Sequence, residues 1–157
     1  MALQPHQSTL PDDKRLRILA FAHMAAGSAT IGSETYKDKL YLVVNLGESD
    51  TVYNELKLNQ AARVAKVMNE KLLTVLKALA SPIADVAGIY GLKIEFQVPH
   101  RNFLNAGTYA ETDKLEAYVP ADAVKKFADA DITSQQLVDG SVVIVNDNRV
   151  QVGLSEQ

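Results

Sequence analysis

Cysteine is absent from this chain of 157 residues, and the absence excludes several kinds of chemistry at once. Without thiols there is no disulfide bridge, no thiol nucleophile, no cysteine-based zinc site and no iron–sulfur cluster. The redox compartment stays open, because a chain without cysteine tolerates either environment. We expect an ordinary hydrophobic core to hold the fold, since 47% of the residues are hydrophobic and about two thirds of the unfolded surface is buried at this length.

Long apolar runs and clusters of basic residues are missing as well. No segment approaches the roughly 20 apolar residues that cross a bilayer, so the sequence predicts a soluble protein without a transmembrane segment. The 16 Lys and Arg residues are spread along a chain with a net charge of -3. Nucleic-acid binding draws most of its affinity from phosphates neutralised by basic side chains. A nucleic-acid partner is therefore not expected.

The common motifs for metals, phosphates and nucleophiles are also absent. His6, His23 and His100 show neither H-x-x-x-H nor H-E-x-x-H spacing, so no metal site is predicted. Residues 27–33 have the glycine spacing of a phosphate loop but no lysine before Ser33, and that lysine supplies the main cation of such a loop. No G-x-S-x-G sequence occurs. The sequence predicts no cofactor and no catalytic residue, and an enzyme is the less favoured class.

The strongest pattern that is present is an amphipathic helix over Asn59–Ala80. Its apolar residues recur at intervals of three and four, as on one face of a helix. Asn59 is a suitable N-cap, and Ser81-Pro82 is expected to end the helix, because proline disfavours helical geometry at the residue before it. The predicted apolar face is Ala61, Val64, Ala65, Met68, Leu72, Val75, Leu76 and Leu79, and the predicted polar face is Arg63, Lys66, Glu70, Thr74 and Lys77.

A first, shorter helix is predicted over residues 12–26. Asp12 and Asp13 suit its first turn, where the helix dipole favours negative charge. Its predicted inward face consists of Leu16, Leu19, Ala20 and His23. A strand is the alternative, because Leu16, Ile18, Ala20 and Ala22 also alternate. The abundance of alanine favours the helix.

Alternating apolar residues predict strands over residues 40–46, 92–98 and 115–119, and the polar side chains between them, such as Lys93 and Glu95, are expected to face water. Two further elements are predicted, a short helix over 120–128 and a hairpin. The hairpin pairs 142–145 with 150–154 and turns at Asp147-Asn148. Residues 28–39 are expected to form a loop or a short edge strand. The predicted fold is a single α+β domain over residues 12–157. Its antiparallel or mixed sheet of about five strands is covered on one face by the long helix, with two shorter helices.

Residues 1–11 are predicted to be a polar N-terminal tail. They lack the basic n-region and the apolar h-region of a signal peptide. The compartment is unknown. Two origins fit such a tail, a native start or the cut end of an exported protein. We favour an exported or periplasmic protein whose signal peptide is absent from this chain.

One polar cluster is a candidate site. It follows the strand that ends near Pro99, where loops often carry function. A histidine titrates near neutral pH and an arginine clamps carboxylates or phosphates. The candidate ligand-binding residues are His100, Arg101, Asn102, Tyr109 and Glu111. The alternative is a structural loop, in which Arg101 pairs with Glu111 or Asp113 and Asn102 caps a turn.

The function predicted from these patterns is a non-catalytic binding or protein-interaction module. The alternative is a small enzyme, or a binder of small anions, at the cluster after Pro99. The partner is predicted to be an unknown protein or a second copy of the chain. The C-terminal hairpin favours a homodimer, because edge strands offer unpaired N–H and C=O groups and Arg149 is its only basic residue.

Overall fold

The computed structural model describes residues 12–27, 29–49, 51–105, 107 and 109–154, so the predicted tail lies outside the described residues. The described chain has the predicted α+β fold: a mixed sheet of seven strands with one helix of 25 residues and three shorter helices. The sheet thus has two strands more than the roughly five expected. One lies in the segment 28–39, which forms the edge strand Thr30–Tyr36.

The elements follow one another as α1 Asp12–Ala26, β1 Thr30–Tyr36, β2 Lys39–Glu48, β3 Tyr53–Asn54, α2 Gln60–Val67, the π-helical segment η1 Met68–Leu72, α3 Leu73–Ala84, β4 Gly91–Arg101, β5 Glu111–Pro120, α4 Ala121–Ala128, α5 Ser134–Asp139, β6 Val142–Val145 and β7 Asn148–Val150. We call the continuous run of α2, η1 and α3 the long helix.

The strand order is β1-β2-β4-β5-β6-β7, with β3 paired to β4. β2 and β4 are parallel neighbours, and the long helix is part of the crossover that connects them. β3 is also parallel to β4, and the remaining pairs are antiparallel.

Asn146 and Asp147, with φ of 50 and 70°, form the C-terminal hairpin turn, because consecutive positive φ angles match the twist of the flanking strands. The predicted turn and last strand were therefore wrong in position, and β7 is Asn148–Val150.

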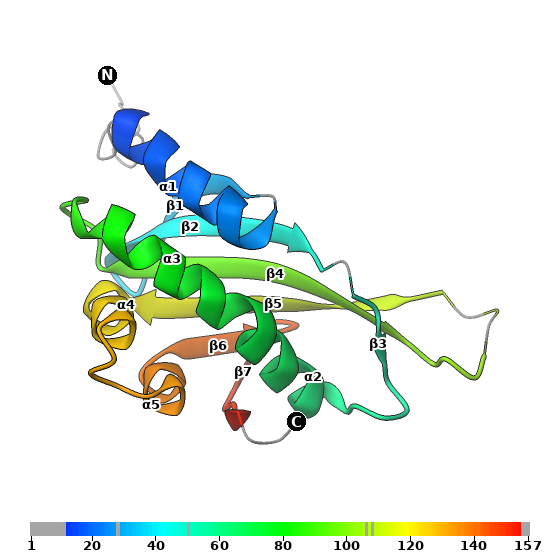
Figure 1. The fold of residues 1–157 in the computed structure, drawn as a ribbon. Helices are drawn as coiled ribbons and strands as arrows, with labels where there is room; N and C mark the ends of the chain where they lie inside the picture. Colours follow the sequence, from blue (N-terminus) through cyan, green and yellow to red (C-terminus); the bar gives the residue numbers. More distant parts are fainter. Residues whose placement is uncertain (1–11, 28, 50, 106, 108, 155–157) are drawn as a thin grey trace.

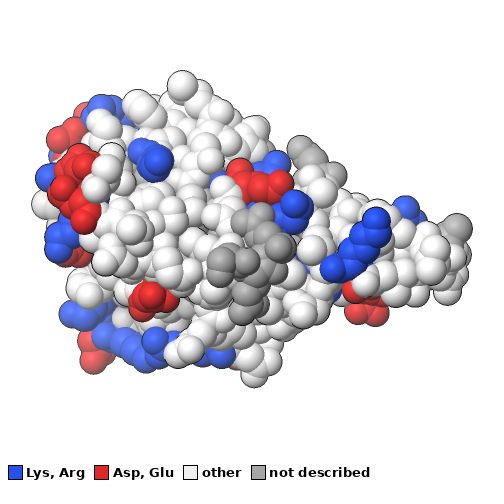
Figure 2. Space-filling model, turned by 60° about the horizontal axis from the view of Figure 1, so that its bottom comes forward, with Lys and Arg blue, Asp and Glu red and all other residues white. Residues whose placement is uncertain are grey.

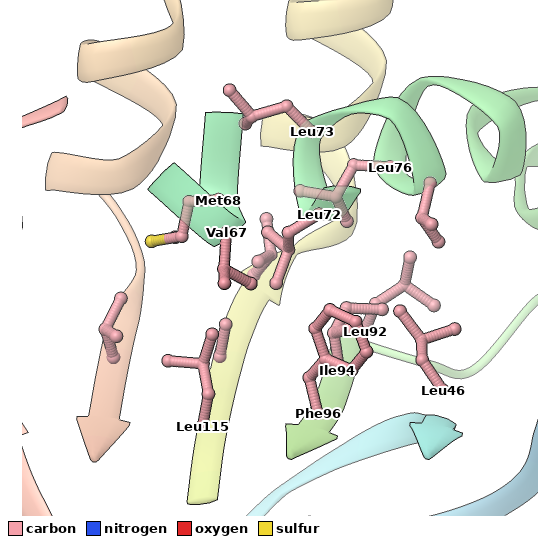
Figure 3. Packing of buried hydrophobic residues seen from close by; sticks show 14 of the residues in the cluster. Leu46, Val67, Met68, Leu72, Leu73, Leu76, Leu92, Ile94, Phe96 and Leu115 are labelled. Atoms are coloured by element: carbon pink, nitrogen blue, oxygen red, sulfur yellow. The ribbon is translucent and has the colours of Figure 1, made fainter. Parts of the chain in front are cut away.

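The core lies between the long helix and one face of the sheet. Figure 3 shows Leu72 and Leu76 above Leu92, Ile94 and Phe96, as the matching helix and strand periods predict. All five are buried. In Figure 1, α1 and α3 lie side by side over the sheet, and α4 packs against α3 from the other side.

Three expectations about the helices were wrong. The long helix does not end at Ser81 but continues to Ala84 with Pro82 inside it. Proline is tolerated there because only one i→i−4 hydrogen bond is lost, in the last turn. In α1, Leu16 is 63% exposed, whereas Ile18 is fully buried, because only a narrow stripe of this helix meets α3 and the sheet. Arg63, expected in water, is buried.

The face of the sheet opposite the long helix is concave. The Tyr36 ring of β1 stacks on the Tyr118 ring of β5 with 4.0 Å between centroids, although β2 and β4 lie between these strands. Neighbouring strands are ~4.8 Å apart, so only a strongly coiled sheet brings the two rings together. Gly91 lies on this face, and a Cβ atom there would be 2.2 Å from the Val119 carbonyl oxygen.

Candidate functional site

The five predicted ligand-binding residues all lie on one projecting part of the molecule. β4 and β5 run beyond the helices as a two-stranded arm (Figure 1). β3 crosses this arm and pairs with its β4 side, with Tyr53 opposite His100 and Asn54 opposite Arg101. We call the described residues from 99 to 113 (99–105, 107 and 109–113) the arm.

The arm separates the candidate residues. His100 is 7% exposed and lies on the helix-covered side, and alternation along β4 places Arg101 on the opposite side. The Arg101 guanidinium carbon lies 5.3 Å from the centre of the Phe103 ring. The Asn102 Oδ1 atom accepts a hydrogen bond from the Leu104 main-chain N–H, so Asn102 does cap a turn.

The other two candidates lie further along the arm. Tyr109 is 91% exposed. Glu111 is exposed and stands opposite His100 in the β4–β5 register. Among the described residues, Arg101 forms an ion pair with neither Glu111 nor Asp113. A common ligand for the five candidate residues stays a prediction.

His100 belongs to a buried polar network that the sequence pattern did not indicate. His100 Nδ1 lies 2.8 Å from Glu55 Oε2, and His100 Nε2 lies 3.5 Å from Asp113 Oδ1. Asp113 Oδ2 accepts hydrogen bonds from Arg63 Nε at 3.2 Å and from Arg63 Nη2 at 3.0 Å. The Asn146 side-chain amide donates to Asp113 Oδ1 at 2.9 Å. We call residues 52–58, which contain β3, the β3 segment. The network fastens the base of the arm to the long helix, the β3 segment and the C-terminal hairpin.

The charges of this network favour the ionised form of Asp113. Burial on its own would raise the pKa of Asp113, but hydrogen bonds from Asn146 and Arg63 and the positive charge of Arg63 hold that pKa below its ordinary value. Arg63 Nη1 also donates to the Leu58 main-chain oxygen at 2.9 Å. Arg63 and Asp113 therefore form a hydrogen-bonded, buried ion pair, which is a structural arrangement.

A second buried cluster lies on the concave face of the sheet. Lys93 was expected to face water, yet it is only 4% exposed. Its Nζ atom lies 2.9 Å from Glu34, 3.2 Å from Glu95 and 2.9 Å from Glu116 carboxylate oxygens. The Tyr118 hydroxyl donates to Glu34 at 2.7 Å. Coiling of the sheet buries Lys93, because it brings β1 over β4 and β5.

The protonation states of this cluster follow from its contacts. Burial would lower the pKa of Lys93, but the surrounding carboxylates raise it above its ordinary value. Burial and the adjacent Glu34 raise the pKa of Tyr118 to about 12. Burial would raise the pKa of Glu34, but hydrogen bonds from Lys93 and Tyr118 lower it. Glu95 and Glu116 face each other in register, and like charges in that position destabilise a sheet, so the Lys93 ammonium offsets their repulsion.

Exposed apolar side chains gather on and beside the arm. The described residues include eight large hydrophobic side chains that are exposed. Five of them form what we call the arm surface: Val52, Leu56, Phe103, Leu104 and Tyr109. The β3 segment that carries the first two is held against the arm by a hydrogen bond from the Glu55 main-chain N–H to the Arg101 main-chain oxygen.

Comparison with protein-family models, with curated proteins and with solved structures gave no significant match. Among the described residues, no helix combines the length and the apolar character needed to cross a membrane. The same part of the chain contains no group of three or more His, Asp or Glu side chains placed to hold a metal ion.

Proposed function

We propose that this α+β chain is a non-catalytic protein-interaction module that makes its contact through the arm surface. The observation that carries the proposal is the concentration of exposed apolar side chains there, with Leu104 88% and Tyr109 91% exposed. Exposed apolar side chains that lie together mark interaction sites, whereas single ones are ordinary. Aromatic residues are also enriched in protein interfaces.

The shape and charge of the arm support this use. Figure 2 shows Lys, Arg, Asp and Glu interspersed over the visible face of the body, whereas the far end of the projecting arm is mostly uncharged. Charged residues are depleted at the centres of interfaces. The Arg101 guanidinium lies over the Phe103 ring, an arrangement that keeps this aromatic side chain at the tip of the arm.

The proposed partner is a second copy of the chain. The C-terminal hairpin, the other surface predicted for self-association, ends in a strand of only three residues, Asn148–Val150. Very short edge strands with an exposed charge such as Arg149 discourage pairing with another chain. The arm surface is therefore the favoured contact.

Sedimentation velocity tests the contact. The wild type is expected to dimerise at micromolar concentration, and the triple variant Phe103→Ser, Leu104→Ser, Tyr109→Ser is expected to be monomeric. The matched control is Leu16→Ser with Met24→Ser, because these α1 side chains are 63% and 81% exposed but lie away from the arm. The control variant should dimerise like the wild type. A wild type that stays monomeric at high concentration, or a control variant that loses the dimer, contradicts the proposal.

The predicted alternative, an anion bound at the cluster of His100 and Arg101, has a separate test. A thermal-shift screen with phosphate and small carboxylates should then stabilise the wild type but not Arg101→Ala. The interaction proposal expects no such shift in either protein, because His100 and Arg101 lie on opposite sides of the arm.

A further inference from the structure

His100 lies at the base of the arm with a carboxylate at each of its two ring nitrogens. Nδ1 is 2.8 Å from Glu55 Oε2, and Nε2 is 3.5 Å from Asp113 Oδ1. The His100 side chain is 9% exposed and that of Glu55 is 33% exposed, so the contact between them borders on water. A neutral imidazole carries one N–H, whereas an imidazolium carries two. Only the protonated ring can therefore donate toward both carboxylates.

The fixed charges around the ring are not balanced without it. Asp113 pairs with the buried guanidinium of Arg63 from the long helix at 3.0 Å, and the Asn146 amide that donates to Asp113 is uncharged. Two carboxylates thus share one guanidinium when the His100 ring is neutral. An imidazolium supplies the second positive charge, and groups withdrawn from water are stabilised by such pairing.

The other groups near the ring leave this balance unchanged. Glu111 is the cross-strand neighbour of His100 on β5, but it is exposed and makes no ion pair with His100 in the described part of the chain. Tyr53 is the neighbour on β3. Burial and the adjacent Glu70 raise the pKa of Tyr53 to about 12, so its hydroxyl stays neutral. Arg101 lies on the opposite side of the arm. Protonation of His100 therefore acts on its contacts with Glu55 and Asp113.

The contact with Glu55 holds the end of the β3 segment against the arm. β3 itself has only two residues, Tyr53–Asn54. Past β3, Glu55 makes the hydrogen bonds between the described segment and the arm: its main-chain N–H donates to the Arg101 main-chain oxygen at 3.1 Å, and its carboxylate meets His100. The next residue, Leu56, is 51% exposed. Segments with few such bonds and little buried apolar surface open locally, without unfolding of the whole domain.

We infer that the β3 segment is a pH-sensitive strap, closed on the arm while His100 is protonated and released when His100 is neutral. Histidine is the side chain that ordinarily changes charge between about pH 5 and pH 8. The contribution of its positive charge is complete at the acidic end of this range and is lost as the pH rises through it. Release also moves Leu56, which is part of the arm surface. That consequence rests on the proposed function, whereas the strap itself does not.

Hydrogen exchange of the Glu55 amide at about pH 5.5 and about pH 7.5 tests the strap. After correction for the intrinsic exchange rate at each pH, wild-type protection is expected to be about fivefold higher at the lower pH, which is the size of effect found for a partly exposed ion pair. The Leu76 amide in α3 is the internal reference and should keep its protection. Equal Glu55 protection at both pH values overturns the inference. A change of the same factor at Leu76 also overturns it, because it would report the stability of the whole domain.

Variants test whether His100 is the group that responds. His100→Gln keeps an N–H donor for Glu55 but does not titrate, so it should remove the pH difference. Glu55→Gln takes its place if His100→Gln does not fold, as judged by circular dichroism, because it removes the charge that the imidazolium meets. His23→Gln is the matched control, since His23 is exposed on α1, and it should keep the wild-type difference. A difference that persists in His100→Gln or Glu55→Gln, or disappears in His23→Gln, refutes the role of His100.

Sedimentation velocity of the wild type at the same two pH values separates the strap from the function proposed for the arm surface. A protein that is monomeric at both values but shows the exchange difference at Glu55 supports the strap and contradicts only the contact between copies. A protein that dimerises while its Glu55 protection is independent of pH supports the contact and overturns the strap.

Discussion

Replacing Lys93 by Met removes the buried cation of the cluster on the concave face. The methionine side chain fills a similar volume, so packing changes little. Three carboxylates, Glu34, Glu95 and Glu116, then lose the ammonium group that contacts all of them. The exposed Lys114 ammonium, 3.8 Å from Glu116, stays nearby. The change therefore isolates the electrostatic contribution of the ammonium group to the free energy of unfolding.

The size of the effect follows from the exposure of each pair. In the Lys93–Glu116 pair, the side chains are 5% and 10% exposed, and removing one partner of a buried pair costs about 3–5 kcal/mol. The Glu34 side chain is 38% exposed, so its pair is screened by water and contributes only about 0.2–1 kcal/mol. We expect Lys93→Met to lower the free energy of unfolding by about 3–5 kcal/mol at neutral pH, mainly through Glu116.

The pH dependence of this loss has a defined sign. Glu34 has a lowered pKa in the folded wild type, so its contribution is present above the ordinary glutamate pKa of about 4.3 and is lost as the pH falls through the lower folded value. In Lys93→Met, protonation instead relieves the repulsion among the carboxylates. The difference between the two proteins should therefore shrink as the pH falls from neutral toward about 4.3.

Urea unfolding followed by circular dichroism at several pH values measures both quantities. Lys114→Met is the control, because its side chain is 54% exposed and lies 3.8 Å from Glu116; it should change the free energy of unfolding by less than about 0.5 kcal/mol. A loss in Lys93→Met no larger than that of the control, or a loss that grows as the pH falls, would show that the ammonium group does not hold these carboxylates together.

Two further predictions concern packing. Leu72→Ala should lower the free energy of unfolding by about 2–5 kcal/mol, because Leu72 is 1% exposed between the long helix and the sheet; a loss under about 0.5 kcal/mol would contradict this packing. Gly91→Ala should cost about 1–3 kcal/mol, because the new Cβ atom meets the Val119 carbonyl oxygen at 2.2 Å. Gly32→Ala is its control in the same urea titration, because no atom lies within 4 Å of a Cβ atom there, and equal losses in both variants would exclude the steric cause.

Sequence patterns correctly predicted structural features that depend only on residues close together in the chain, such as helix caps. Asn59 begins the long helix as expected, since its Oδ1 atom accepts the Ala62 main-chain N–H at 2.9 Å. One local signal was missed: Thr133 and Gln136 form a capping box at the start of α5, and the T-x-x-Q spacing is visible in the sequence. The π-helical segment Met68–Leu72 has no comparable signal, because it depends on how the whole helix meets the sheet.

At the candidate site, the sequence patterns predicted which residues lie near one another but not which way their side chains point. The sequence indicated that residues around His100 lie together just after a strand, and they do share the arm. It could not indicate that His100 turns toward Asp113 while Arg101 turns away, because the predicted strand ended at Val98 and β4 in fact continues to Arg101. The side-chain alternation of that extension separates the two residues.

The sequence alone determined the α+β class, the long helix, and the core residues that join it to the sheet, since helical and strand periods are properties of neighbouring positions. The tertiary structure decided which charges are buried. Arg63 meets Asp113 across 50 positions, and Lys93 meets Glu34 across 59. Strand order and coiling of the sheet bring these partners together, and a charge leaves water only where such a partner stabilises it.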